Sequence, residues 1–250
     1  CSLHSPRAAG AGQDLPTRRG ATMVKPLTDR DIAPEQLAQL DDISLSAELP
    51  LLITDADEVL FAFMAAFEAF LQDTGHFFDW SSFALTGNIR RQSDSSAVDG
   101  ADVGNLLATF FVECTGSMAP VEGAAEALSA LSERLQIIVL SNLPLEQRPV
   151  RQKALHDHGM GYPLIAGAGP KGPLVARIAE AVSAPVFFVD DGPNHHGSVA
   201  RHADHVRRLH MIADKRLARM LAAAPHSHHR ADDWREARRL IEGELDAAGF

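Results

Sequence analysis

The stretch LLITDADEVL, residues 51–60, decides the fold of this chain. The run that contains its beginning, LPLLIT (49–54), is apolar and lacks the alternation of a half-exposed strand. Such a run predicts a strand that is buried on both faces of a parallel sheet. Asp55 and Asp57 then stand just beyond the carboxyl end of that strand, where open α/β sheets bind their ligands.

On both sides of this stretch, short apolar runs alternate with amphipathic, helical patterns. The runs that predict further strands are QIIVLS (136–141), YPLIAGA (162–168), APVFFVDD (184–191) and VRRLHMIA (206–213). The segments that predict helices are 31–43, 60–71, 106–116, 121–135, 145–159, 172–183, 192–203, 215–224 and 234–250. Strands and helices that alternate in this way predict an α/β fold with a doubly wound, Rossmann-like parallel sheet.

The carboxyl ends of three predicted strands carry side chains that are suited to chemistry. Asp55 and Asp57 end the first, Ser141 and Asn142 the second, and Asp190 and Asp191 the third, and Lys171 precedes a predicted helix near the same edge. Taken singly, each of these residues also suits a helix cap, a turn or a solvated surface. Their joint occurrence at one edge favours a functional site.

Four carboxylates at one edge repel one another unless a positive charge lies between them. Mg²⁺ is a hard cation that binds one or two carboxylates together with substrate oxygens. A cation and the Lys171 amine would also attract a phosphate, although the formal net charge of the chain is −10. We therefore expect a magnesium site that accepts an anionic substrate.

In combination, these residues resemble the four short motifs of the haloacid dehalogenase (HAD) superfamily of phosphohydrolases. LLITDADEVL is similar to the first motif, IIVLSN to the second, Lys171 to the third and VFFVDD to the fourth. The resemblance covers approximately residues 48–215 and implies a Rossmann-like core.

The resemblance also implies a role for each residue. Asp55 would be the nucleophile that accepts the phosphoryl group and would bind Mg²⁺. Asp57 would act first as general acid and then as general base, and would lend its backbone carbonyl to the metal. Ser141, Asn142 and Lys171 would bind the phosphate, with Lys171 also neutralising the nucleophile. Asp190 and Asp191 would hold the metal directly or through water.

The second acid of the first motif separates activities within this superfamily. Phosphatases and phosphomutases use it to protonate a leaving alkoxide, whereas dehalogenases expel halide and typically lack it. The presence of Asp57 favours a phosphohydrolase that acts on a small phosphorylated metabolite. A phosphomutase, a dehalogenase-like hydrolase and a non-catalytic, ligand-binding member of the fold are the alternatives.

The chain departs from the common phosphatase pattern at two places. Glu58 and Val59 stand where Gly-Thr is usual, and His195 stands where some members carry another acid or Asn. Glu58 adds a negative charge beside the site or points away from it. For His195, a surface position at the start of a helix is favoured over contact with the water shell of the metal.

The segment between the first two motifs is longer than a direct crossover requires. The resemblance implies a small helical cap domain there, at residues 63–118, which closes over the site and selects the substrate. The α/β core then comprises residues 31–62 and 119–250. Arg90 and Arg91 are the paired basic residues of this cap, and a solvated pair is favoured over a substrate contact.

Composition excludes several other classes of protein. An acidic chain without a Lys/Arg-rich run is a poor candidate for binding nucleic acid or an anionic membrane. Two cysteines, Cys1 and Cys114, cannot form a disulfide framework, which favours a reducing, cytoplasmic environment. No apolar stretch is long enough for a transmembrane helix.

Two features of the sequence have no assigned function: the N-terminal residues and the many histidines. Residues 1–30 are rich in Gly, Ala, Pro, Ser and Arg and predict a disordered tail, with a transit peptide as an alternative. The twelve histidines lack a zinc-binding spacing and are interpreted as mostly solvated surface residues.

Overall fold

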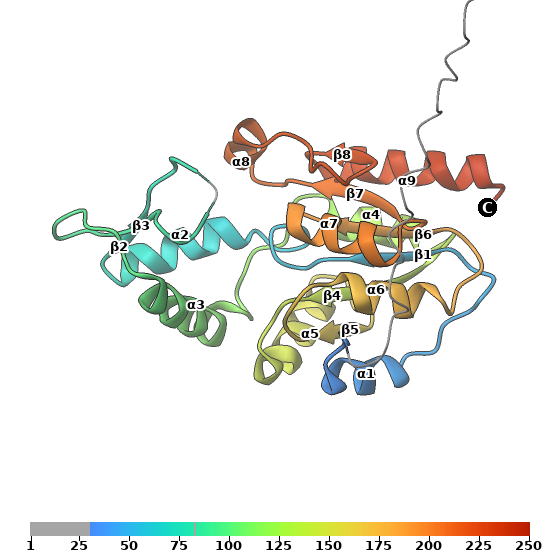
Figure 1. The fold of residues 1–250 in the computed structure, drawn as a ribbon, viewed down its shortest axis with the longest axis horizontal. Coiled ribbons are helices and arrows are strands. Elements are labelled where there is room, and N and C mark those ends of the chain that lie inside the picture. Colours follow the sequence, from blue (N-terminus) through green and yellow to red (C-terminus); the bar gives the residue numbers. More distant parts are fainter. Residues whose placement is uncertain (1–30, 83) are drawn as a thin grey trace, which may run out of the picture.

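The computed structural model describes residues 31–82 and 84–250. At its centre is a six-stranded sheet with the order β5-β4-β1-β6-β7-β8, in which all neighbouring strands are parallel. The strands are β1 (Leu51–Thr54), β4 (Gln136–Ser141), β5 (Leu164–Ala166), β6 (Val186–Asp190), β7 (Arg207–Met211) and β8 (His229–Ala231) (Figure 1). The first four residues of the stretch 51–60 therefore form a central strand, between β4 and β6.

Alternate residues of the strands face two separate apolar layers. Leu51 and Ile53 of β1 pack into one layer with α1 (Pro34–Asp41), α6 (Gly172–Ala179) and α7 (Pro193–His202). Leu52 points to the opposite layer. That layer is formed with α4 (Ala124–Leu131), α5 (Arg148–Asp157) and α9 (Trp234–Ala248). Every residue of β1 is buried, and the predicted α/β, doubly wound sheet is confirmed.

The predicted strands and helices of this sheet occur within a few residues of their expected positions. Where the sequence predicts one helix over 145–159, a short 3-10 turn, Leu145–Gln147, precedes α5. The predicted helix 215–224 is shorter and ends as α8 (Lys215–Met220). Strand β8 was not predicted, because its three residues, His229–Ala231, carry no apolar run.

The segment of residues 63–118 lies to one side of the sheet (Figure 1). It contains α2 (Phe63–Asp73), an antiparallel pair of strands, β2 (His76–Phe78) and β3 (Ile89–Arg91), and α3 (Gly100–Cys114). We call it the inserted segment. The sequence did not predict this hairpin, because two three-residue strands are too short to leave a periodic pattern.

Aromatic side chains join the two helices of the inserted segment. The Phe110 ring of α3 lies edge-on to the rings of Phe63, Phe67 and Phe70, with centroid distances of 5.2, 5.1 and 5.6 Å. Edge-to-face arrangements at this separation are favourable for aromatic rings. The apolar stripe of the predicted helix 60–71 is thus used for packing.

Some sequence expectations lie outside the described residues or are only partly covered by them. The predicted disordered tail, residues 1–30, falls outside, as does Cys1, while Cys114 is a free cysteine. Among the helices of the described ranges, none combines the length and the apolar character needed to cross a bilayer.

Candidate functional site

The carboxyl ends of three adjacent strands meet at the middle of the sheet. Ser141 and Asp190 are the last residues of β4 and β6, which flank β1 on either side. Asp55 directly follows β1, and its backbone N–H donates to the carbonyl of Val189 at 2.8 Å. The order of the strands therefore brings together residues that are far apart in the sequence.

We call Asp55, Asp190 and Asp191 the acidic group. Lys171 lies next to these three residues. Its ammonium is 2.8 Å from Asp55 Oδ1 and 2.7 Å from Asp190 Oδ2, and its side chain is almost fully buried. The other oxygen of Asp190 accepts from the Gly192 N–H at 2.8 Å, and Asp55 Oδ1 also accepts from the Ala56 N–H at 2.7 Å. One buried cation thus bridges the predicted nucleophile and one of the predicted metal ligands.

A glycine allows Lys171 to reach this position. Gly172, the first residue of α6, packs so closely on α7 that a Cβ atom there would lie 2.4 Å from the carbonyl oxygen of Ser198. The Gly172 N–H donates to Ser198 Oγ at 3.1 Å. This close approach of the two helices is accessible only to a residue without a side chain.

Burial and mutual repulsion shift the pKa values in this group. Burial, together with the charges of Asp190 and Asp57, raises the pKa of Asp55 to about 7, although Lys171 opposes the shift. Burial and the charges of Asp190 and Asp55 also raise the pKa of Asp191 well above its usual range. For Asp190 burial acts in the same direction, but the Lys171 ammonium outweighs it and lowers the pKa.

The acidic group fits a hard divalent cation. Oxygen atoms of Asp55, Asp190 and Asp191 all lie within 4.8 Å of one another. Lys171 compensates the charges of Asp55 and Asp190, while no hydrogen bond or ion pair from the described residues reaches the Asp191 carboxylate. Carboxylate oxygens are the ligands that Mg²⁺ prefers, and a cation here would supply the missing positive charge.

The carboxylate of Asp57 lies outside this group and contacts a different cation. Arg151 Nη2 donates to Asp57 Oδ1 at 2.6 Å, and Ser141 Oγ donates to Asp57 Oδ2 at 3.3 Å. Arg151 is fully buried, with its guanidinium 4.6 Å from the centroid of the Phe61 ring. Both oxygens of the predicted general acid are therefore held by side chains of the core.

Sequence reasoning missed Arg151. The residue belongs to α5, whose buried positions are Arg151, Ala154 and Leu155. These positions share one helical face, because residues three and four apart are neighbours on a helix. The placement of an arginine on that apolar face was the available signal.

Asn142, a predicted phosphate ligand, uses its amide N–H within the protein. Its Nδ2 donates to the Gly169 carbonyl at 3.0 Å, which links the end of β4 to the loop before Lys171. The Asn142 Oδ1 atom is buried and has no hydrogen-bond partner within the described residues. In this arrangement Asn142 connects two of the loops that carry site residues.

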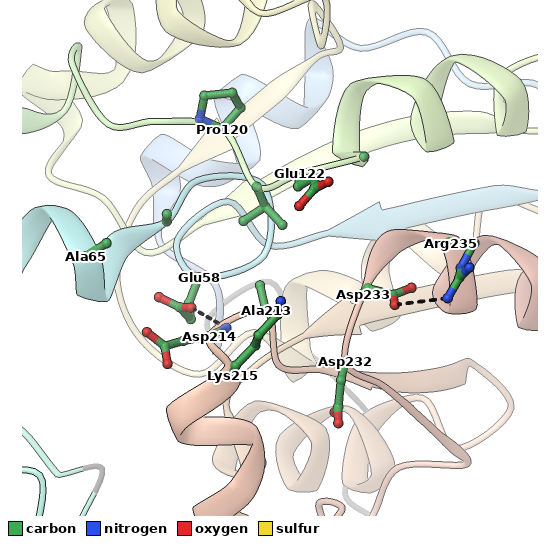
Figure 2. Close-up of a pocket in the computed structure, with 13 residues that line it drawn as sticks. Glu58, Ala65, Pro120, Glu122, Ala213, Asp214, Lys215, Asp232, Asp233 and Arg235 are labelled. Atoms are coloured by element: carbon green, nitrogen blue, oxygen red, sulfur yellow. Dashed lines mark hydrogen bonds and ion pairs between the residues drawn. The ribbon is translucent and has the colours of Figure 1, made fainter.

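Glu58 is buried and points away from the acidic group. Its carboxylate accepts hydrogen bonds from the Met64 N–H at 2.9 Å and from the Asp214 N–H at 3.0 Å. The second bond is drawn in Figure 2, where Glu58 lines a cavity of about 530 Å³ at the base of the inserted segment. Burial raises the pKa of Glu58 to about 7.

The backbone of Glu58 is also unusual. Its φ is +60°, in the left-handed region that favours the glycine of the common motif. A non-glycine residue there costs on the order of 1 kcal/mol. The two hydrogen bonds to the carboxylate compensate for this cost and fix the loop after β1.

Three other residues that the sequence singled out form no hydrogen bond or ion pair with the acidic group among the described residues. His195 is half-buried in the first turn of α7, where burial lowers the pKa of its imidazole. Arg90 pairs with Asp79 at 2.8 Å, and Arg91 pairs with Asp102 at 3.2 Å. Both arginines thus form ion pairs with acidic residues of the inserted segment.

The interpretation of the histidines as surface residues was wrong for two of them. His196 and His210 have no exposed surface, whereas His202, His205, His226 and His228 are exposed. Both buried imidazoles contact the backbone of the acidic pair: His196 Nε2 lies 2.9 Å from the Asp190 carbonyl oxygen, and His210 Nε2 lies 2.8 Å from that of Asp191.

Comparison with known proteins gives matches in structure only. No family model matches the sequence, and no curated protein matches it. A HAD hydrolase of Bacillus subtilis, YfnB, bound to magnesium, is 15% identical with a TM-score of 0.53, and the match covers 78% of this chain and 99% of that one. A HAD family hydrolase of Deinococcus radiodurans, with bound phosphate and sodium, is 18% identical with a TM-score of 0.55 and coverages of 80% and 98%.

A third solved structure with the same architecture is a dehalogenase. The L-2-haloacid dehalogenase of Xanthobacter autotrophicus is 14% identical with a TM-score of 0.50, and the match covers 78% of this chain and 99% of that one. At such identities the likeness concerns the fold. The chain therefore has the fold of the haloacid dehalogenase (HAD)-like hydrolases, as the resemblance of its motifs predicted.

Proposed function

We propose that this protein is a Mg²⁺-dependent phosphohydrolase that acts on a small phosphorylated metabolite through an aspartyl-phosphate intermediate. The observation that carries the proposal is the joint arrangement of Asp55, Lys171 and the acidic pair Asp190 and Asp191 at one edge of the sheet. Structural neighbours with bound magnesium and with bound phosphate support the choice of metal and of substrate class.

Asp55 is the nucleophile in this proposal. Its Oδ1 is held by the Lys171 ammonium and by the Ala56 N–H, and no donor of the described residues reaches Oδ2. Oδ2 forms a bond to phosphorus while the bond from phosphorus to the leaving oxygen breaks. The covalent intermediate divides hydrolysis into two easier steps.

Asp57 transfers the protons. It gives a proton to the leaving alkoxide in the first step, and in the second step it takes one from the water that attacks the aspartyl phosphate. Arg151 and Ser141 fix the direction of its carboxylate. A halide leaving group needs no proton, so the presence of Asp57 favours phosphate esters over haloacids.

Asp55, Asp190 and Asp191, with the backbone carbonyl of Asp57, would hold the metal. Mg²⁺ supplies positive charge that keeps these carboxylates ionised and polarises the phosphoryl oxygens. Lys171 and Ser141 bind the remaining phosphoryl oxygens, with Asn142 in support. Phosphoryl transfer depends mainly on such positioning and charge compensation.

In the same proposal the inserted segment, residues 63–118, is a cap that closes over the site and selects the substrate. Its two connections to the core run side by side, because the Ala62 N–H donates to the Ala119 carbonyl at 2.9 Å. Ala62 and Pro120 both line the cavity that Glu58 also lines, and Pro120 is labelled in Figure 2. Closure of such a segment excludes water and completes a catalytic site.

The test is hydrolysis of an aryl phosphate and then of a panel of phosphorylated metabolites, with Mg²⁺ and with a chelator. We expect activity that the chelator abolishes and that falls at least about 1,000-fold in Asp55→Asn. The matched control is Asp41→Asn, which makes the same change at an exposed residue of α1. Turnover that survives in Asp55→Asn would contradict the nucleophile, and halide release from haloacids without phosphatase activity would assign the site to dehalogenation.

A further inference from the structure

Two carbonyl groups at the end of β6 are bound by side chains. Asp190 is the last residue of the strand and α7 begins at Pro193, so Asp191 and Gly192 connect the two regular elements. The carbonyl oxygens of Asp190 and Asp191 accept from the imidazoles of His196, in α7, and His210, in β7, at 2.9 and 2.8 Å. Each of the two acids therefore has its own imidazole donor.

The hydrogen bonds define which nitrogen of each imidazole ring carries the proton. A carbonyl oxygen only accepts, so Nε2 of each imidazole carries the proton. His210 Nδ1 accepts from the Ala224 N–H at 3.0 Å, which leaves that ring neutral with both nitrogens used. His196 Nδ1 is buried without a partner, and burial lowers the pKa of His196 to about 4.

Packing holds the two rings in place. The His196 ring lies edge-on to Phe188, at 5.6 Å between centroids, and edge-on to His210, at 5.4 Å. Neither histidine has exposed surface. An apolar residue could fill the position of His196 without leaving a buried nitrogen unpaired, so the fold alone does not account for an imidazole there.

We propose that His196 and His210 are positioning residues that fix the backbone of Asp190 and Asp191 and thereby the direction of the two carboxylates toward the metal. We call them the histidine pair. When both carbonyl groups are held, the Cα–Cβ bonds of the two acids are held as well. This inference rests on the proposed function, because the carboxylates it orients are the proposed metal ligands.

The consequence is an effect on metal affinity that comes from residues that do not touch the metal. Groups that orient metal ligands through hydrogen bonds change metal affinity by about 10- to 100-fold when they are removed. The histidine pair differs from the usual case because it binds the backbone of the ligands and not their carboxylates. Its effect should therefore also be visible without metal.

The first measurement is the Kd of Mg²⁺, by calorimetric titration of the full chain. His196→Leu removes the donor, and we expect the Kd to rise about tenfold. His196→Gln keeps an N–H at a similar reach and should stay within about threefold of the wild type. The matched control is His202→Leu, because His202 lies in the same helix and also contacts a backbone carbonyl, that of Ser198, at 2.8 Å.

The second measurement needs no metal. The Gly192 N–H donates to Asp190 Oδ1 at 2.8 Å, so its hydrogen exchange reports whether that carboxylate is held. In metal-free protein we expect faster exchange of this amide in His196→Leu and wild-type exchange in His196→Gln and His202→Leu. If His196→Leu does not fold, His196→Phe preserves the ring contact with Phe188 and also lacks the donor.

The two measurements separate this inference from the proposed function. A wild-type protein that binds no Mg²⁺ contradicts the proposed function. The hydrogen exchange of the Gly192 amide then tests by itself whether the histidine pair positions the acids. Wild-type Mg²⁺ affinity together with wild-type Gly192 exchange in the donor-free variants overturns the inference. A purely structural role would change the melting temperature of His196→Leu and His196→Gln alike and leave the Kd unchanged.

Discussion

Among single residues, Arg151 has an unusual environment for a charged side chain. It is fully buried, it donates to Asp57 Oδ1 at 2.6 Å, and its Nε and Nη1 have no partner within the described residues. A buried arginine with unpaired nitrogens is costly for stability. We expect that Arg151 orients Asp57, the proposed general acid.

We predict that Arg151→Met lowers kcat about 10- to 100-fold with little change in KM, because Asp57 then keeps only the contact with Ser141. Arg151→Lys should recover part of the loss, since lysine restores the charge without the planar fork. Steady-state kinetics on the wild type and both variants, with melting temperatures as a check on folding, measure this. A wild-type kcat in Arg151→Met would rule out the orienting role.

Some residues of the candidate site could be located from the sequence, and others could not. Asp55, Asp190 and Asp191 could be located because they follow apolar runs that form strands for simple reasons of burial. His210 could not, because its burial comes from the positions of Asp191 and Ala224, which only the tertiary structure brings to its ring. Arg151 left a signal on the apolar face of α5, but the sequence does not identify Asp57 as its partner.

Among the elements, strands with a continuous apolar run were predictable, including the three-residue β5, and short strands without such a run were not. β1, β4 and β6 are buried on both faces, so each leaves a continuous apolar run in the sequence. β8 and the hairpin strands have three residues each, and their pairing is decided by neighbouring elements. Prediction therefore succeeded for the strands whose carboxyl ends carry the candidate site and failed for the short strands that lack an apolar run.

One contact joins the inserted segment to the core through α8. The Arg216 guanidinium lies 3.9 Å from the centroid of the Trp80 ring, and it pairs with Glu68 at 2.7 Å. The indole N–H of Trp80 donates to the same carboxylate at 2.6 Å. Arg216 belongs to the core, whereas Trp80 and Glu68 belong to the inserted segment.

We predict that Arg216→Ala makes Trp80 more accessible to solvent, measured as stronger quenching of its fluorescence by acrylamide. Loss of a cation–π contact of about 1 kcal/mol shifts the population of open arrangements roughly fivefold. Arg219→Ala on the same helix is the control, and Trp80→Phe gives the signal of the second tryptophan, the buried Trp234. Equal quenching in Arg216→Ala and Arg219→Ala would show that the contact does not hold the inserted segment.

The stability of the whole molecule should depend on pH through Glu58. Burial raises the pKa of this carboxyl from 4.5 to about 7 in the folded protein, and the unfolded chain has no such burial. Between these values the folded state keeps a proton that the unfolded state has lost. The free energy of unfolding therefore falls as the pH rises from about 4.5 to 7, and it is lowered by at most about 3 kcal/mol above pH 7.

The variant Glu58→Gln isolates this contribution, because Asp55 and the other buried acids titrate in both proteins. We predict that the wild type loses stability relative to Glu58→Gln as the pH rises from 5 to 7, with a constant difference above that range. Urea unfolding of metal-free protein at several pH values measures the difference, with the exposed Glu48→Gln as control. A difference that does not change with pH would mean that the hydrogen bonds from Met64 and Asp214 compensate fully for burial and keep Glu58 ionised in the folded state.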